Sequence, residues 1–508
     1  MSDSNTIANR SKYYLTGALA YLNGKPHIGH AYEFLTSDVV FRFYEVLGVD
    51  AKYVLGSDEH GQKVEAASAA KGVKPQDWVD SCVVSFLELM SKLNITKFTW
   101  VRTTSAKHKE CVHWLWNRVF DRGYVYLGTY DGWYNPKEEA FVTANEAKLH
   151  NFVCPVSKIA YEMRSEECYY FKMSLFHDRI LRLIRDTDFL MPVDQRNALV
   201  ARLESEPLSD LSVTRTKLSW GVPVPNDAKH VMYVWFDALS GYLSGVNAHK
   251  ADTGDKTYWP ADVHIIGKDI VWFHCVIWPA ILMAAEIELP KHVFAHGFVM
   301  AEDGSKMSKS LNNVIEPLDY IEKCGADPYR WYTIRNGHYG HDIKFSGQAL
   351  YTMNNADLCG IVGNLVNRGL SLCEKYCDSC VSSLSYSLLY NAAEILHSIK
   401  SSMEHFELEA LAEAGLKVCR SANKFLTDEQ PWIMEDASKR TQVIYSVLDS
   451  VYFVAHVLYP VIPAAALKIC DLLNLPMQLL TDFNQTPNLK LGIVVKKRTN
   501  LFAHLQWS

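Results

Sequence analysis

The chain has 508 residues, of which 48% are hydrophobic and 21% are charged, and its net charge is −6 at pH 7. This length is too great for one hydrophobic core and predicts roughly two to four domains. The composition is that of a soluble globular protein, and the balance excludes a global basic field that attracts nucleic acid, so any RNA contact must come from local patches. No apolar run reaches the ~20 residues that cross a bilayer.

The first eleven residues are polar, which argues against a secretory signal, and the first expected strand follows too soon for a mitochondrial presequence. The twelve cysteines are scattered through apolar stretches, as in proteins of a reducing compartment. These features predict a cytoplasmic protein, with a mitochondrial or other organellar location as the alternative.

The first 50 residues after the polar start predict a strand, a turn, a helix and a second strand. Residues 13–21 are an apolar run, residues 31–47 carry apolar side chains at helical spacing, and residues 51–55 are a further apolar run. His27, Gly29 and His30 therefore stand at the N-terminus of a helix.

Unpaired N–H groups at a helix N-terminus attract phosphate, Gly29 lets the backbone approach a ligand, and both histidines can donate hydrogen bonds. Two incidental histidines in a loop are the alternative interpretation.

Further along the chain, the second strand leads into residues 56–61, which place Asp58 at the carboxyl end of that strand, and then into expected helices at 62–71 and 76–93. Residues 123–128 and 130–134 predict two short antiparallel strands. Residues 233–236 predict an apolar strand before a small-residue helix start. Residues 264–267 predict another buried strand. Gly267 and Asp269 stand at its carboxyl end, which is where parallel sheets bind ribose.

The last third is almost wholly helical in pattern. Apolar spacing predicts helices that the short connections would pack as an antiparallel bundle, over residues 353–376, 388–406, 408–426 and 441–458.

A second polar motif, which runs from Lys306 through Met307, Ser308 and Lys309 to Ser310, follows an apolar run. Its lysines and serines make a donor-rich clamp suited to a polyphosphate, while a solvated basic loop is the alternative. The two motifs in this order resemble the paired signatures of class I aminoacyl-tRNA synthetases, and in particular the methionyl-tRNA synthetase family. The resemblance runs from about Tyr13 to about Pro463.

The resemblance implies an α/β fold. A Rossmann-type catalytic domain with a parallel sheet would carry an inserted connective domain and be followed by an all-α anticodon-binding bundle. The expected units are the first catalytic half at 12–115, the connective insertion at 116–232, the second catalytic half at 233–325, a stem-contact module at 326–352, and the helical domain with its tail at 353–508.

The resemblance also implies a methionine pocket. Asp58 matches the carboxylate that holds the α-amino group, although it could serve only as a turn or helix cap. Aromatic walls suit a polarizable thioether, although each aromatic residue taken alone could be a core residue. Ala20 stands where many relatives carry proline. The expected methionine-binding residues are Leu19, Tyr21, Asp58, Trp235, Ala238, Leu239, Tyr242, Ile270 and His274.

For tRNA, the resemblance implies that Asn364, Arg368 and Trp432 grip the anticodon, since unpaired bases are read by stacking and edge hydrogen bonds. A core position is the alternative for Trp432.

Metal ligands are not expected. The connective insertion of the family often carries zinc knuckles made of paired cysteines, but this interval holds only Cys154 and Cys168. Cys373, Cys377 and Cys380 form a cluster that we interpret as thiols at a helix end, with a metal site as the alternative. No structural zinc is predicted.

The function that the resemblance implies is methionine–tRNA ligation. ATP, with Mg²⁺, and methionine would form methionyl-adenylate, which tRNA(Met) would then accept. His27, His30, Lys306 and Lys309 would be catalytic; Gly29, Met307, Ser308, Ser310, Gly267 and Asp269 would complete the ATP site. A monomer without membrane contact is expected. The rivals are a class I synthetase for leucine, isoleucine, valine or cysteine, and a non-catalytic RNA-binding protein built on a retired synthetase.

Overall fold

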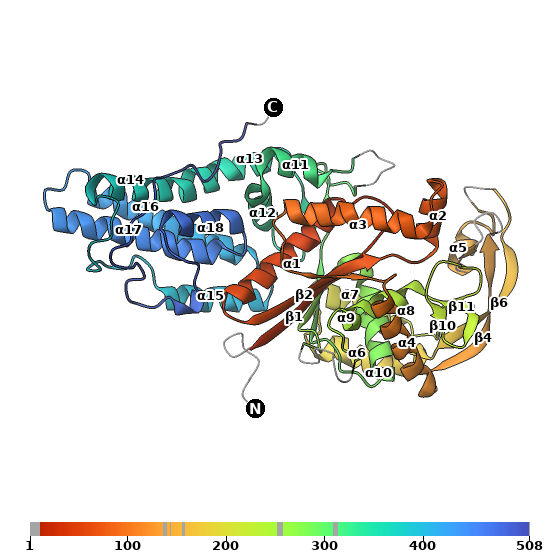
Figure 1. Cartoon of the computed structure of the whole chain (residues 1–508). Coiled ribbons are helices and arrows are strands. Elements are labelled where there is room, and N and C mark those ends of the chain that lie inside the picture. Colours follow the sequence, from red (N-terminus) through yellow and green to blue (C-terminus); the bar gives the residue numbers. More distant parts are fainter. Residues whose placement is uncertain are drawn as a thin grey trace.

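The computed structural model describes residues 11–135, 140–142, 144–154, 158–250, 258–307 and 313–506. It has a central parallel sheet, a β-rich extension at one end and a helical bundle at the other (Figure 1). The predicted fold class, an α/β catalytic part followed by a helical part, is confirmed.

Six parallel strands form the central sheet in the order β3-β2-β1-β12-β13-β7. Since β1 has β2 on one side and β12 on the other, the strand order reverses at β1, and ligands bind at the carboxyl ends of strands at such a point. The strands are β1 Lys12–Tyr21, β2 Asp50–Asp58, β3 Thr99–Arg102, β7 Leu190–Met191, β12 Val263–Gly267 and β13 His292–His296.

The sheet separates two hydrophobic cores, as alternation along β12 shows. Ile265 packs into one core and Ile266 into the other. The first core joins the sheet to α1 Ile28–Val46, to α3 Pro75–Lys92 and to the bundle. The second contains α4 Ala106–Asp121, α8 Val234–Leu239, α9 Gly241–Ser244 and α10 Trp278–Ala284, which lie on the opposite side of the sheet in Figure 1.

The expectation of two short strands at 123–128 and 130–134 is wrong. One continuous strand, β4 Val125–Asn135, pairs antiparallel with β6 Glu162–Phe171 along its length, despite Gly128 and Gly132. The other elements of this extension are β5 Ala140–Val142, α5 Ala144–Leu149, α6 His177–Asp186, α7 Val193–Ser205, β8 Leu211–Ser212, β9 Thr214–Arg215, β10 Pro223–Val224 and β11 Asp227–Met232.

Residues 233–236 are not a strand either, because β11 ends at Met232 and α8 begins two residues later. An apolar run of four residues does not distinguish a buried strand from a buried helix, and here packing against α4 decided for helix.

The helical part departs from the prediction chiefly at its start, and the helix expected at 388–406 begins only at Ala392. Residues 353–376 are not one α-helix: α13 Gly347–Met353 passes into a π-helix at Asn354–Gly363 before α14 Asn364–Tyr376. The remaining elements are α2 Gln62–Ala70, β14 Val299–Met300, α11 Pro317–Cys324, α12 Ala326–Arg335, β15 Ile343–Lys344, α15 Ala392–Glu404, α16 Glu409–Glu429, α17 Ala437–Leu458 and α18 Pro463–Leu472.

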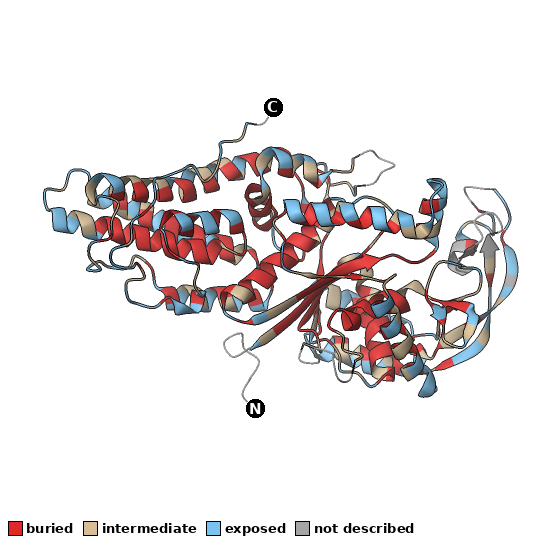
Figure 2. Ribbon diagram, in the orientation of Figure 1, coloured by how far each residue is buried: buried red, intermediate tan, exposed pale blue. Residues whose placement is uncertain are grey.

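Among the described residues, one helix, α17, has the length and apolar character of a membrane span, and 89% of its apolar window is buried within the protein. Figure 2 shows it as a mostly buried helix inside the bundle, which is the ordinary environment of a core helix.

Candidate active site

A cleft of about 1110 Å³ opens at the carboxyl ends of β1, β2 and β12. It is lined by residues from both halves of the sheet and from the β-rich extension. Every expected methionine-binding residue lines it, together with His27, Gly29, His30, Gly267 and Asp269 of the expected ATP site. The structure thus brings together side chains that are far apart in the sequence, while their roles stay predictions.

The two histidines cap the helix whose N-terminus they occupy. The N–H of Gly29 donates to Nδ1 of His27 and the N–H of His27 donates to Nδ1 of His30, each over 3.1 Å. Because both Nδ1 atoms accept, the neutral rings carry their protons on Nε2. The ring centroids lie 3.9 Å apart. Burial, and then the neighbouring His27, hold the pKa of His30 well below its ordinary value.

A chain of hydrogen bonds fixes the back of the expected methionine pocket. Nδ1 of His274 lies 3.0 Å from the carbonyl oxygen of Ile270, so this nitrogen donates and Nε2 accepts from the hydroxyl of Tyr242 over 2.7 Å. Burial lowers the pKa of His274 to about 4, and the carbonyl of Ile270 opposes this only in part. The pocket wall is therefore uncharged at neutral pH.

Aromatic rings close the side of the same pocket. Trp235 stacks on Phe273 with centroids 3.8 Å apart and an angle of 6° between the planes. His274 and Phe273 lie in a π-helical turn, Phe273–Ile277, a local irregularity common at functional sites. Phe273, which the sequence did not single out, thus holds the ring of Trp235 in place.

Asp58, at the end of β2, is buried and lines the cleft. Burial, and then the charge of Asp237, raise the pKa of Asp58 well above its ordinary value. A carboxylate in this position gains a stabilising partner when a cation binds beside it.

Behind Asp58 lies a buried trio that sequence reasoning missed. Asp237 accepts from Nδ1 of His60 over 2.6 Å and from Nε2 of His108 over 2.8 Å. Burial alone would raise the pKa of Asp237, but the two histidines outweigh it and lower that pKa to about 2. The trio ties the end of β2 and α4 to α8, which carries Trp235. No spacing rule links three residues so distant in the chain.

The described part of the expected phosphate-binding loop lies close to the cleft. Nζ of Lys306 lies 4.5 Å from the ring centroid of Phe298, which lines the cleft, and Nζ of Lys268 lies 4.7 Å from the same centroid. Met307 is half-buried. Ser308, Lys309 and Ser310 lie outside the described residues.

Glu33, one turn after His30, also lines the cleft and was missed. Its carboxylate accepts from the N–H of Ala18 over 2.7 Å and faces Nε2 of His296 at 3.2 Å. Its place three residues after His30 on one helix face was a signal for it. Arg215 and Lys217 of the β-rich extension line the cleft as well, where no motif marked them.

The three expected anticodon residues lie in the bundle, away from the cleft. Arg368 and Asn364 donate to Oδ1 of Asn423, at 3.0 Å and 3.3 Å. Trp432 is 43% exposed, so it is not a core residue, and its carbonyl accepts from the hydroxyl of Tyr376. Asn423, which joins α16 to this set, was not anticipated.

The cysteine cluster lies at the end of α14, and Cys373, Cys377 and Cys380 are free thiols. Among the described residues, no group of three or more His, Cys, Asp or Glu side chains is arranged to hold a metal ion. The absence of structural zinc stays a prediction.

Comparison with known proteins places this geometry in a family. The profile of the family described as "tRNA synthetases class I (M)" matches residues 13–148 and 142–370. The methionine–tRNA ligases of Rickettsia felis and Brucella suis are each 37% identical to the chain; the alignments cover 92% of this chain and 92% and 93% of theirs. The Mycobacterium tuberculosis methionyl-tRNA synthetase bound by methionyl-adenylate has a TM-score of 0.88 at 35% identity, covering 97% of this chain and all of that one.

Proposed function

The chain belongs to the class I tRNA synthetases of the methionine type, and from this premise we propose how its own residues carry the reaction. It is a methionine–tRNA ligase: it activates methionine with ATP and transfers the methionyl group to tRNA. The cleft at the reversal point of the sheet supports the assignment of both substrates to one place.

In the first step a carboxylate oxygen of methionine attacks the α-phosphorus of ATP, and the bond to pyrophosphate breaks. Positioning and charge stabilisation carry such a step. His27 and His30 would donate from Nε2 to the α-phosphate oxygens as negative charge develops there, since their Nδ1 atoms are occupied by the helix cap. Lys306 and Lys309, with Met307, Ser308 and Ser310, would hold the leaving pyrophosphate.

ATP would enter as its magnesium complex, whose metal is held mainly by the phosphates. Gly267 supports the ribose role of Asp269, because a Cβ at Gly267 would stand 2.7 Å from Oδ1 of Asp269 and displace that carboxylate. Asp58 would hold the ammonium group of methionine, and the rings of Trp235 and Tyr242 its thioether, alongside Leu19, Tyr21, Ala238, Leu239, Ile270 and His274.

In the second step a hydroxyl of the terminal adenosine attacks the carbonyl carbon of the adenylate and AMP leaves. Asn364, Arg368 and Trp432 would select tRNA(Met) through its anticodon. The half-exposed ring of Trp432 supports a stacking role. We propose that the units at 12–115, 116–232, 233–325, 326–352 and 353–508 divide this work, in a monomeric cytoplasmic enzyme that does not contact a membrane.

The observation that carries the proposal is the convergence of the helix-capping histidines and the Tyr242–His274 pocket on one cleft. The test is exchange of labelled pyrophosphate into ATP with single amino acids. We expect exchange with methionine and not with leucine, isoleucine, valine or cysteine. Exchange with another of these amino acids would replace the substrate assignment, and no exchange at all would indicate a retired synthetase.

A further inference from the structure

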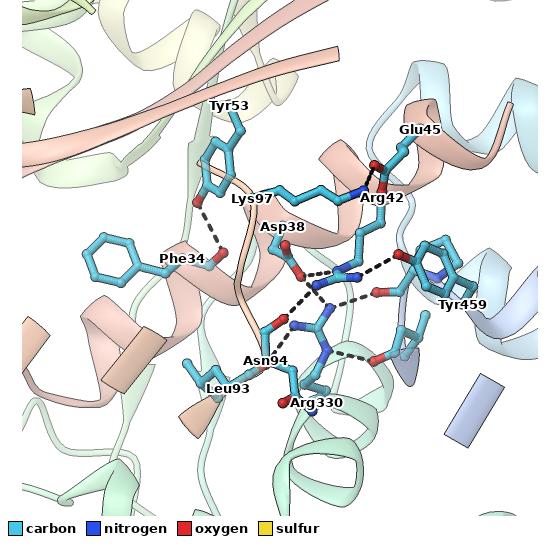
Figure 3. A network of polar contacts seen from close by, with 12 residues as sticks. Phe34, Asp38, Arg42, Glu45, Tyr53, Leu93, Asn94, Lys97, Arg330 and Tyr459 are labelled. Carbon is cyan, nitrogen blue, oxygen red and sulfur yellow. Dashed lines mark hydrogen bonds and ion pairs between the residues drawn. The ribbon is translucent and has the colours of Figure 1, made fainter. Parts of the chain in front are cut away.

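A cluster of four buried charges lies where α1 meets the helical bundle. Oδ2 of Asp38, on α1, accepts from Nε of Arg42 and lies 2.7 Å from Nη2 of Arg330, on α12 (Figure 3). The side chains of Asp38 and Arg330 are fully buried. Asp327 faces the same cluster, so two carboxylates balance two guanidinium groups.

Both arginines also reach the bundle. Arg330 donates to the carbonyl oxygens of Val461 and Pro460 over 2.8 Å and 2.7 Å, and Nη1 of Arg42 donates to the hydroxyl of Tyr459 over 3.0 Å. The accepting residues form the turn between α17 and α18. The carboxylate of Asp327 receives the N–H of Ala465, in the first turn of α18. One charge cluster thus connects α1 to the turn that follows α17.

The two helices that meet there begin at the two functional regions. α1 starts beside His27 and contains His30, and Asp38 and Arg42 lie in its second half. α17 starts at its N-cap Asp436, four residues after Trp432, and its 22 residues span about 33 Å to Tyr459. The first six residues of α17 are exposed or half-buried, but from Val443 to Leu458 every residue is buried, so a displacement that reaches this part is carried to the end of the helix rather than absorbed by side chains in solvent.

One buried acceptor of the cluster is unused, and it offers the arginines a second arrangement. Both arginines share one oxygen of Asp38, while Oδ1, also buried, has no hydrogen-bond partner among the residues that the structure describes. A buried acceptor left without a donor is costly, and a small shift of the turn at 459–461 would let one arginine move to it. An element with two arrangements is what energetic coupling between distant sites requires.

We propose that Asp38, Arg42 and Arg330 are positioning residues. They would couple anticodon binding at Asn364, Arg368 and Trp432 to the first turn of α1. When the bundle holds a matching anticodon, it fixes the position of the turn after α17. Through the shared carboxylate of Asp38, this turn fixes the positions of His27 and His30 in the cleft. This inference rests on the proposed anticodon role of Trp432 and adds to it a route by which a correct anticodon raises the rate of charging.

The test uses Tyr459→Phe in the full-length enzyme, which removes one hydroxyl between Arg42 and the bundle, and Arg42→Lys, which keeps the charge but cannot span the same partners. Tyr452→Phe is the matched control, because it also removes one buried tyrosine hydroxyl, which donates from α17 to the carbonyl of Pro476 and lies near Oε1 of Gln478, without touching the cluster. Each protein is assayed for pyrophosphate exchange without tRNA, and for charging of a tRNA(Met) transcript and of the same transcript with a changed anticodon.

Tyr459→Phe and Arg42→Lys should leave exchange within about twofold of wild type, lower kcat for the matching transcript roughly 3- to 30-fold, and leave the changed transcript unaffected. Tyr452→Phe should keep the wild-type ratio between the transcripts. An unchanged ratio in both cluster variants, or equal losses on both transcripts, would overturn the inference while the proposed function stands. If wild type charges both transcripts equally, the anticodon role fails, and this inference fails with it.

Discussion

At the scale of single residues, the two histidines of the first motif serve the helix and the cleft with different atoms. Nδ1 of each ring closes the first turn of α1, and the helix cap therefore fixes which nitrogen is left to donate. A protonated ring would lose its Nδ1 acceptor, and the depressed pKa of His30, which burial causes first, keeps that ring neutral. The helix cap thus fixes the tautomer of both rings, which present a protonated Nε2 to the cleft.

Replacing His30 by alanine should lower methionine-dependent pyrophosphate exchange roughly 100- to 1000-fold, as the loss of one donor to a developing oxyanion does in other enzymes. The protein should stay folded, because the cap contributes only about 1 kcal/mol. His405→Ala, at the exposed end of α15, is the control and should exchange normally. Normal exchange by the His30 variant, with circular dichroism unchanged, would remove this histidine from the mechanism.

Asp58 gives a prediction about pH. Its pKa is raised, by burial first and by Asp237 second, and protonation as the pH falls through this raised pKa leaves a neutral group that cannot pair with an ammonium. We expect KM for methionine to rise as pH falls through this raised pKa and to be constant above it. Asp58→Asn should raise KM about 10- to 150-fold, the loss of a charged hydrogen bond, and abolish the pH dependence. A pH dependence that persists in the variant would assign the titration to another group.

At the scale of elements, the sequence predicted the long helices well, since α1, α3 and α17 each carry an apolar pattern longer than any strand. It failed where local and tertiary signals conflict. Gly128 and Gly132 look like turns, but the full length of β6 holds β4 straight. Residues 233–236 look like a strand, but the packing of Phe236 on Trp116 makes them helical.

The site residues also divide into those that the sequence predicted and those that it missed. His27, His30 and the residues of the pocket carried a motif or a resemblance, and the structure places them in one cleft. The buried trio of His60, His108 and Asp237 carried none, because its hydrogen bonds join elements that only the folded sheet brings together.

The loop before α17 supplies a prediction at this scale. Trp432→Ala should leave pyrophosphate exchange unchanged and lower kcat/KM for tRNA(Met) about 5- to 150-fold, the value of one base stacked on an aromatic ring. Ile433→Ala removes a neighbouring side chain that is 68% exposed and should charge tRNA as wild type does. Equal losses in exchange and charging by the Trp432 variant would contradict the anticodon assignment.

At the scale of the whole molecule, the sheet separates two hydrophobic cores that join different elements. The first is continuous from β1 and α1 through α12 into the bundle, so the first catalytic half and the bundle share one hydrophobic interior. The second joins the β-rich extension to α8 and α10. Residues from the parts of the molecule built on each core line the cleft. A movement of one part relative to the other would therefore alter the site.

The continuity of the first core predicts how the molecule unfolds. Arg330→Met keeps much of the side-chain volume but leaves Asp38 with Arg42 alone and three carbonyl oxygens without their donor. Removing one partner of a buried charge cluster costs about 3–5 kcal/mol. Because Arg330 joins the catalytic helix to the bundle, this loss should also divide a single thermal transition into two, with the bundle unfolding separately. Calorimetry of this variant beside Arg498→Met, in the exposed tail, makes the measurement; one cooperative transition at the wild-type temperature would mean that the shared hydrophobic core, and not the charge cluster, holds the two parts together.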